Sequence, residues 1–268
     1  MTDKFYRPIT HQGYKSKKVE EGLKNSFHHV PKAILRKGDE IWNIAIENIG
    51  KKRDFHFGDD KYLLRDSESK VVPIWGGGIS LFGLIVFLWG EDLTNSKTWD
   101  TGMFFFIGTP LFFLLFFIFY FFTMPKKEDI LNRKDGTITF PGSFWGKNIT
   151  MPFSNVIFHF STGGENAIGA YMLQIVRPTN HTFRIYSHGD DCYESISGIV
   201  WYMDKNRPLP PGTAFDAYRD ADFERRKAEG FPPPLYPSQV PTPEATKEQQ
   251  KERDNYWRDL DYITNIKY

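Results

Sequence analysis

Two long uncharged stretches constrain this chain more than any other feature. Residues 71–89 carry no charged side chain, and at about 1.5 Å per residue a helix of that length covers roughly 28 Å, close to the hydrocarbon thickness of a bilayer. Residues 103–124 are also uncharged and are rich in phenylalanine. Core helices of soluble domains rarely stay uncharged on every face for so long. The sequence therefore predicts a two-helix transmembrane hairpin, 71–124.

The charges that flank the two spans predict their orientation. The loop between them, 90–102, carries Glu91, Asp92 and Asp100 against Lys97. Because Lys and Arg near span ends stay on the cytoplasmic side, we expect both termini in the cytoplasm and the loop outside. No long apolar segment precedes residue 71, so the first span is expected to serve as a signal anchor. The basic flanks are Lys51, Lys52, Arg53, Lys61, Arg65 and Lys70 before the hairpin and Lys126, Lys127, Arg133 and Lys134 after it.

Small residues predict close contact between the two spans. Gly76, Ser80 and Gly83 form a narrow face on the first span, against which the second can pack. Gly108 and Pro110 are expected to loosen or kink the second span. Because neither span contains Asp, Glu, Lys, Arg or His, the hairpin is predicted to be an anchor, with an intramembrane surface for a partner as the alternative.

After the hairpin, alternating apolar residues predict a small α+β domain, 125–207. Strands are expected at 137–140, 149–153, 156–160, 171–176 and 182–186, with a tight turn at Asp135-Gly136. A helix then follows, capped by Ser187, Asp190 or Asp191, and Pro208 ends it. Its buried face is predicted to contain Tyr193, Ile196, Val200 and Met203. The predicted fold class is therefore an α+β membrane protein, in which a helix caps a small antiparallel sheet.

Two flanking regions complete the chain. In the N-terminal cytoplasmic segment, 1–70, an amphipathic run at 41–49 precedes Lys51, and it either packs on the sheet domain or lies on anionic lipid. The C-terminal tail, 208–268, is rich in proline and predicts helices at 214–229 and 244–262 within a spacer or wrapping segment. Its Phe231, Leu235 and Tyr236 are expected to dock on an aromatic groove, either of this chain or of a partner.

Motifs for catalysis are lacking in the sequence. The densest polar cluster is 187–192, where His188, Asp190, Asp191 and Cys192 offer metal ligands and a thiol, although a helix-capping loop needs the same residue types. The pair His28-His29 is predicted to be exposed rather than metal-binding. A single cysteine excludes an intramolecular disulfide and a Cys-based zinc site. We therefore expect no catalytic residue, no metal and no cofactor.

The strings Leu-Asn-Arg-Lys-Asp-Gly-Thr-Ile at 131–138 and Met-Pro-Phe-Ser-Asn-Val at 151–156 resemble the opening hairpin of bacterial pleckstrin-homology-like (PH-like) domains that follow two membrane spans. The layout of 71–210 resembles a family of proteobacterial double-pass inner-membrane proteins, some of which are encoded near type VI secretion or polymorphic-toxin genes. This resemblance implies a PH-like fold, a location in the bacterial inner membrane with loop 90–102 in the periplasm, and a protective role such as immunity to a toxin.

These observations predict a non-enzymatic inner-membrane binding protein, with membrane lipid and a protein, such as a secreted toxin or type VI effector, as partners. The rival prediction is a membrane-anchored scaffold or lipid-sensing module that reads anionic phospholipid through the basic flanks. A third is an enzyme that uses the 188–192 loop. With 34 basic and 33 acidic residues, the net charge of +1 excludes a generally basic nucleic-acid binder.

Overall fold

The computed structural model describes residues 4–37, 49, 55–65, 70–90, 101–162, 172–179, 184–189 and 191–265. The chain forms two compact units. The hairpin unit comprises Ser67–Lys127 and Gly142–Lys147, and the sheet unit comprises Met1–Asp66, Glu128–Pro141 and Asn148–Tyr268. The amphipathic run predicted at 41–49, except Ile49, lies outside the described residues, as do loop residues 91–100, Asp190 and the beginning of the strand predicted at 182–186.

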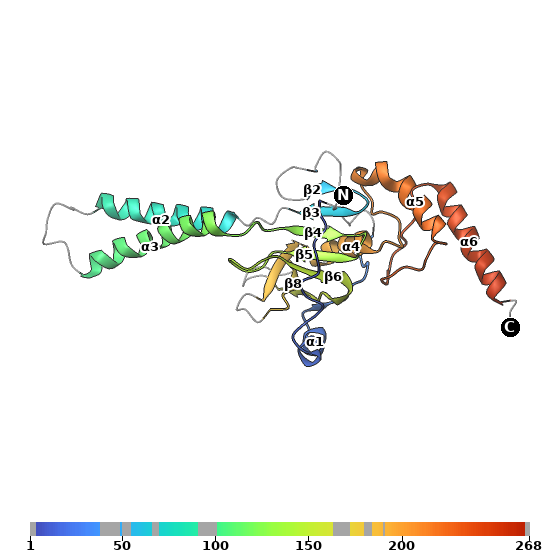
Figure 1. Ribbon diagram of the computed structural model, residues 1–268, viewed down its shortest axis with the longest axis horizontal. Coiled ribbons are helices and arrows are strands. Elements are labelled where there is room, and N and C mark those ends of the chain that lie inside the picture. Colours follow the sequence, from blue (N-terminus) through green and yellow to red (C-terminus); the bar gives the residue numbers. More distant parts are fainter. Residues whose placement is uncertain are drawn as a thin grey trace. The chain divides into compact units, whose positions relative to one another are not determined.

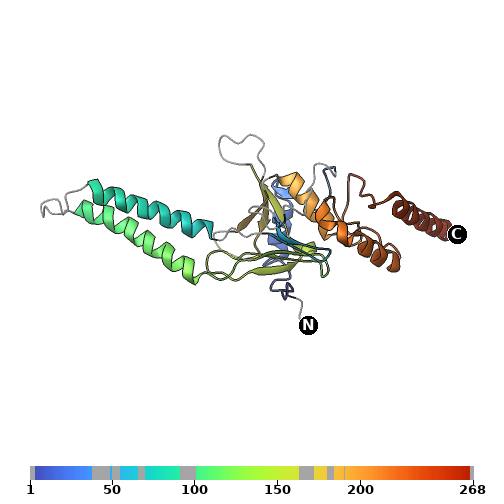
Figure 2. The same cartoon turned by 90° about the horizontal axis from the view of Figure 1, so that it is seen from above.

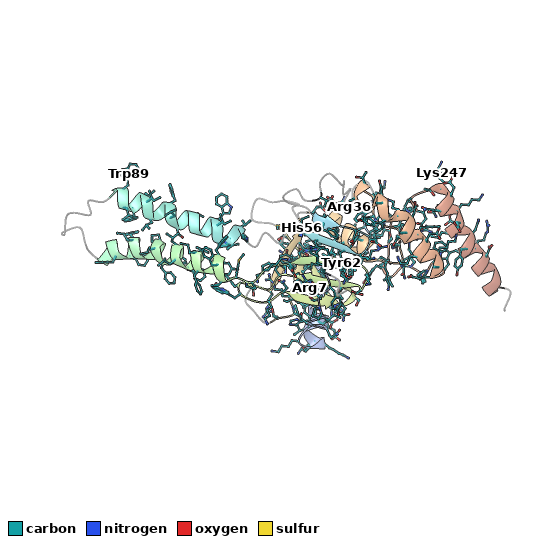
Figure 3. The ribbon with its side chains drawn as sticks, turned by 45° about the horizontal axis from the view of Figure 1, so that its top comes forward. Arg7, Arg36, His56, Tyr62, Trp89 and Lys247 are labelled. Atoms are coloured by element: carbon teal, nitrogen blue, oxygen red, sulfur yellow. The ribbon has the colours of Figure 1, made fainter. Side chains whose placement is uncertain are left out.

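In the hairpin unit, α2 (Val71–Gly90) and α3 (Thr101–Thr123) run side by side (Figures 1 and 2). They contain candidate membrane spans at Val71–Trp89 and Phe104–Thr123, and only 6% of each apolar window is buried. Their aliphatic and aromatic side chains project outward along both helices, as far as Trp89 near the end of α2 (Figure 3). A core helix of a soluble protein would bury this surface. The hairpin is thus compatible with the predicted two-span membrane protein, with the second span one residue shorter at each end.

The two helices are in contact at the predicted small-residue face. A Cβ added to Gly76 would overlap the ring of Phe117, and one added to Gly83 would lie 3.9 Å from Cβ of Pro110. Ser80 donates a hydrogen bond to the carbonyl of Gly76 over 2.7 Å, which satisfies its hydroxyl within α2. The close contact predicted from Gly76 and Gly83 is confirmed. Pro110 lies inside α3, which continues as a helix beyond it.

A five-stranded antiparallel sheet begins the sheet unit, in the order β2-β3-β4-β5-β6. Three strands follow the hairpin in sequence: β4 (Asp129–Asn132), β5 (Thr137–Phe140) and β6 (Ile149–Pro152). Two strands precede the hairpin, β2 (Phe55–Gly58) and β3 (Tyr62–Arg65), and sequence analysis did not predict them. β3 pairs with β4, with Arg65 opposite Asp129, although residues 66–128 separate them in sequence. The segments on both sides of the hairpin therefore build one sheet.

A second antiparallel sheet has the order β1-β7-β8-β9. Its strands are β1 (His29–Val30), β7 (Phe158–Ser161), β8 (Met172–Val176) and β9 (Ile185–Gly189). A short 3-10 helix, η3 (Phe153–Asn155), lies between β6 and β7. An exposed helix, α1 (Lys17–Lys24), which is capped by Ser16, precedes β1. The strands expected from alternating residues after the hairpin are thus present where the structure describes them.

Helix α4 (Cys192–Met203) packs with both sheets in one core. Asp191 is its N-cap, because its side chain accepts a hydrogen bond from the Glu194 amide over 2.8 Å. The prediction for Tyr193 is wrong, since its ring is exposed. The core joins side chains of both sheets and α4, among them Leu63, Leu131, Ile138, Phe158, Leu173, Ile175, Ile196, Ile199 and Val200.

The proline-rich C-terminal segment is docked on the sheet unit. It forms η4 (Thr213–Tyr218), α5 (Arg219–Ala228) and α6 (Lys247–Asn265), close to the two predicted helices (Figure 1). Leu209 and Phe215 belong to the main core, and Phe231 is buried against Phe223 and Tyr256. Tyr236 packs edge-on against Phe153 at 5.4 Å. Phe231 and Tyr236 thus dock within this chain, whereas Leu235 is exposed.

Candidate functional site

The described residues of the 187–192 cluster have different structural roles and do not form one site. His188 is fully buried, Asp191 caps α4, and Cys192 is buried at the first turn of that helix. Burial, followed by the charge of Asp191, raises the pKa of the Cys192 thiol to about 11. A thiol with such a pKa is protonated at neutral pH and is a weak nucleophile. Among the described residues, no group of three His, Cys, Asp or Glu side chains has a geometry that fits a metal ion.

His188 instead belongs to a buried polar cluster that joins the two sheets. Its Nδ1 lies 3.0 Å from Oδ2 of Asp129, which is on β4, and the Tyr186 hydroxyl donates a hydrogen bond to the same oxygen over 3.0 Å. Arg65 on β3 donates to the backbone carbonyl of His188. Burial, reinforced by the Asp129 charge, raises the pKa of Tyr186. The cluster therefore fixes β9 to the first sheet.

Three histidines lie close together: His28 immediately before β1, His29 in β1 and His159 in β7. The rings of His28 and His29 are centred 6.4 and 6.5 Å from that of His159. Both are partly buried, which corrects the expectation of an exposed pair. Burial lowers the pKa of His29, and His159, Lys32 and Lys24 lower it further. The pKa of His159 is also lowered, by burial and then by His28, against the opposing effect of its hydrogen bond to Leu23.

The densest ionic network fixes the C-terminal segment. Arg133, in the β4–β5 turn, is buried and donates to carbonyls at the end of α4 and to Asp222 of α5 over 3.2 Å. Arg226 bridges Asp222 and Glu244, at 2.9 and 2.7 Å. Burial opposes ionisation of Asp222, but the surrounding guanidiniums, Arg133 first, outweigh it and lower its pKa. Sequence analysis counted Arg133 only as a basic flank, because its partners lie far along the chain.

A groove beside this network is the best candidate for binding. It has a volume of about 540 Å³ and is lined by Phe231, Pro232, Pro234, Trp257 and Arg258, among others. Two other lining guanidiniums, of Arg207 and Arg253, already hold Asp204 and Glu244. Arg258 is exposed and donates to Asn255 over 2.8 Å. The lining combines aromatic and proline side chains with the exposed guanidinium of Arg258 and the exposed carboxylate of Asp254, so it suits an apolar peptide that carries a charged group.

Comparisons with known proteins gave no match to a family model, a curated protein or a solved structure. The polar clusters of this chain connect parts of the fold to each other, and the groove combines an apolar lining with exposed charged side chains. The most direct chemistry of this arrangement is binding.

Proposed function

We propose that the chain is a non-enzymatic protein of the bacterial inner membrane that presents a partner-binding domain on the cytoplasmic side. The observation that carries this proposal is the pairing of β3 with β4. Because the two strands flank the hairpin and share a sheet, both ends of the hairpin must return to the same side of a membrane. An even number of spans satisfies that requirement, and α2 and α3 supply two.

The basic residues that flank the spans support a cytoplasmic location for the sheet unit. In the folded protein Lys127 and Arg133 are buried, and Lys127 donates to the carbonyls of Gly142 and Gly146. The charge rule acts while the chain inserts, before the sheet unit folds, so these buried side chains still count toward orientation. A cysteine-labelling test with a membrane-impermeant reagent on intact cells checks this. We expect Thr94→Cys, in the outer loop, to react, and Phe27→Cys to react only after the cells are opened.

Binding rather than catalysis is supported by how the titratable side chains are used. Asp129, His188 and Tyr186 join the sheets, and the Arg133 network holds the C-terminal segment. The groove at Trp257 retains exposed apolar and guanidinium surface. We propose that this groove takes the partner, and that a PH-like arrangement of the two sheets and α4 is the platform that presents it.

The narrower form of the proposal is immunity to a secreted toxin or type VI effector, with the toxin as partner. Its test is purification of the full-length chain from host membranes in mild detergent, followed by identification of bound proteins. We expect one near-stoichiometric partner that is lost with Trp257→Ala plus Arg258→Ala and kept with Phe27→Ala, a control change of an exposed aromatic residue that does not line the groove. Equal recovery with both variants would remove the groove from the proposal.

Protection of cells separates immunity from other binding roles. If the partner is a toxin, expression of the wild-type chain should rescue growth, and the Trp257/Arg258 variant should rescue it less. Co-purification of lipid alone would instead favour the lipid-sensing module. Unchanged protection by a His188→Ala plus Cys192→Ala variant that still folds would argue against an enzymatic role for that loop.

A further inference from the structure

The connection between β5 and β6 belongs to the hairpin unit rather than to the sheet unit. In this loop, residues 142–147, the Trp145 indole donates a hydrogen bond to the Thr123 hydroxyl over 2.8 Å. Its ring packs edge-on against Tyr120 at 4.8 Å and against Phe116 at 5.9 Å. The Trp145 indole therefore contacts three residues on one face of α3, near its C-terminal end: Phe116, Tyr120 and Thr123.

These contacts fix the depth of the loop along α3. Thr123 ends the candidate span, and Phe116 lies about 10 Å before it, at roughly 1.5 Å per residue. An indole that reaches Phe116 lies alongside the apolar span rather than beyond its end. If α3 leaves the hydrocarbon layer at the end of this span, Trp145 lies close to the boundary with the headgroups, where tryptophan is enriched.

The loop is also held in one shape. Lys127 binds the carbonyls of Gly142 and Gly146 at 2.8 and 2.6 Å, and the Gly146 amide donates to Ser143 over 2.7 Å. Phe144 adopts a φ of 44°, a backbone region that side chains with a Cβ rarely occupy. Such strained positions persist where the surrounding contacts determine them, and they occur often at binding sites.

The loop exposes apolar rings close to lysines. Phe144 is 44% and Trp145 41% exposed, although both contact Tyr120. Lys126 and Lys147, in the same unit, are exposed as well. Aromatic rings beside basic side chains at the end of a span suit the interface of an anionic bilayer, where rings enter the headgroup layer and lysines meet phosphates.

We propose that the 142–147 loop is a third membrane contact, in which Phe144 and Trp145 enter the lipid interface beside α3 and Lys126 and Lys147 favour anionic phospholipid. This inference rests on the proposed membrane anchoring, and it adds a lipid-contact site outside the two spans. The loop then fixes the depth of the C-terminal end of α3 in the membrane. Phe144 and Trp145 both contact Tyr120 of α3, so a shift of α3 would move these rings out of the interface.

Site-directed labelling of the full-length chain tests the proposal. An environment-sensitive fluorophore is attached to Phe144→Cys, Leu115→Cys or Phe27→Cys in nanodiscs of phosphatidylcholine with or without phosphatidylglycerol. Leu115 is an exposed residue in the middle of α3, and Phe27 is an exposed phenylalanine of the sheet unit. The native Cys192 is buried, so wild-type protein should stay unlabelled. Quenchers attached to lipid chains and quenchers in water then report the surroundings of each label.

We expect lipid-attached quenchers to act on the labels at 115 and 144, and aqueous quenchers to act on the label at 27. Quenching at 115 with a water-exposed label at 144 would overturn the loop contact but leave the anchor intact. A label at 144 protected from both quenchers would also overturn it and indicate a protein-covered face. A water-exposed label at 115 would instead overturn the membrane anchoring itself.

The lysines are tested separately. Lys126→Gln plus Lys147→Gln should remove the increase in lipid quenching at 144 that phosphatidylglycerol is expected to cause. The matched control Lys17→Gln plus Lys18→Gln, on the exposed helix α1, should leave that increase unchanged. An increase that survives the loop substitutions would remove anionic selectivity from the proposal.

Discussion

At the scale of single residues, Arg133 links more of the fold than any neighbouring side chain. Its guanidinium donates hydrogen bonds to carbonyls at the end of α4 and to the Arg207 carbonyl. It also donates one to the Asp222 carboxylate. Carbonyls at a helix C-terminus carry partial negative charge, which a buried cation offsets. One side chain from a β-turn therefore joins α4 to the C-terminal segment.

We expect Arg133→Met to lower the free energy of unfolding by about 3–5 kcal/mol, because it leaves Asp222 buried with fewer partners. Arg133→Lys should restore little, since an ammonium cannot span this set of carbonyls. Arg258→Met, at an exposed guanidinium, should change stability by about 0.5 kcal/mol or less. Denaturant unfolding of the full-length protein in detergent measures all three, and equal losses for Arg133→Met and Arg258→Met would contradict this account.

The histidines predict a pH dependence. His29 and His159 have folded-state pKa values below their ordinary value, so the unfolded chain binds protons more readily than the folded chain. Stability should then fall as the pH drops below about 6.5, where unfolded histidine takes up a proton. The measurement is the thermal midpoint between pH 7.5 and 5.5. His159→Gln should flatten that dependence, and an unchanged slope would exclude His159 as its source.

At the scale of elements, the hairpin contact at Gly76 permits a matched pair of substitutions. Gly76→Ala places a Cβ into the Phe117 ring, whereas Gly78→Ala meets no atom within 4 Å. We expect Gly76→Ala to destabilise the helix pair by about 1–3 kcal/mol, as overpacking does. Gly78→Ala should be near neutral. Thermal unfolding in detergent compares the variants, and addition of Phe117→Leu should restore part of the loss in Gly76→Ala.

The elements also show what could be predicted from sequence. The spans and the strands β5 and β6 were predictable, because uncharged length and period-two alternation are local signals. β2 and β3 were not, since each is four residues long and gains its place only through pairing with strands beyond the hairpin. The groove at Trp257 was missed for a similar reason, because it forms where the proline segment meets α6.

At the scale of the whole molecule, the β3–β4 pairing connects the proposed membrane insertion to folding. Leu115→Arg places a charge in the middle of α3 and should hinder insertion of the second span. β4 would then be kept on the opposite side of the membrane from β3, and the first sheet could not form. We expect the variant to lose protease resistance in the sheet unit. The control Phe27→Arg, a charge at an exposed position of the sheet unit, should keep it, and a resistant Leu115→Arg protein would refute this coupling.

The same pairing sets a timetable for biogenesis. β2 and β3 leave the ribosome before either span, yet β4, the second neighbour of β3, is made only after residues 66–128 have been synthesised. Until then β3 carries an open edge, which is a template for aggregation and a target for chaperones. With the proposed two-span topology, the sheet completes only when the segments before and after the hairpin lie on the same side of the membrane. A stalled or misinserted chain would display that edge, and quality-control proteases could recognise it.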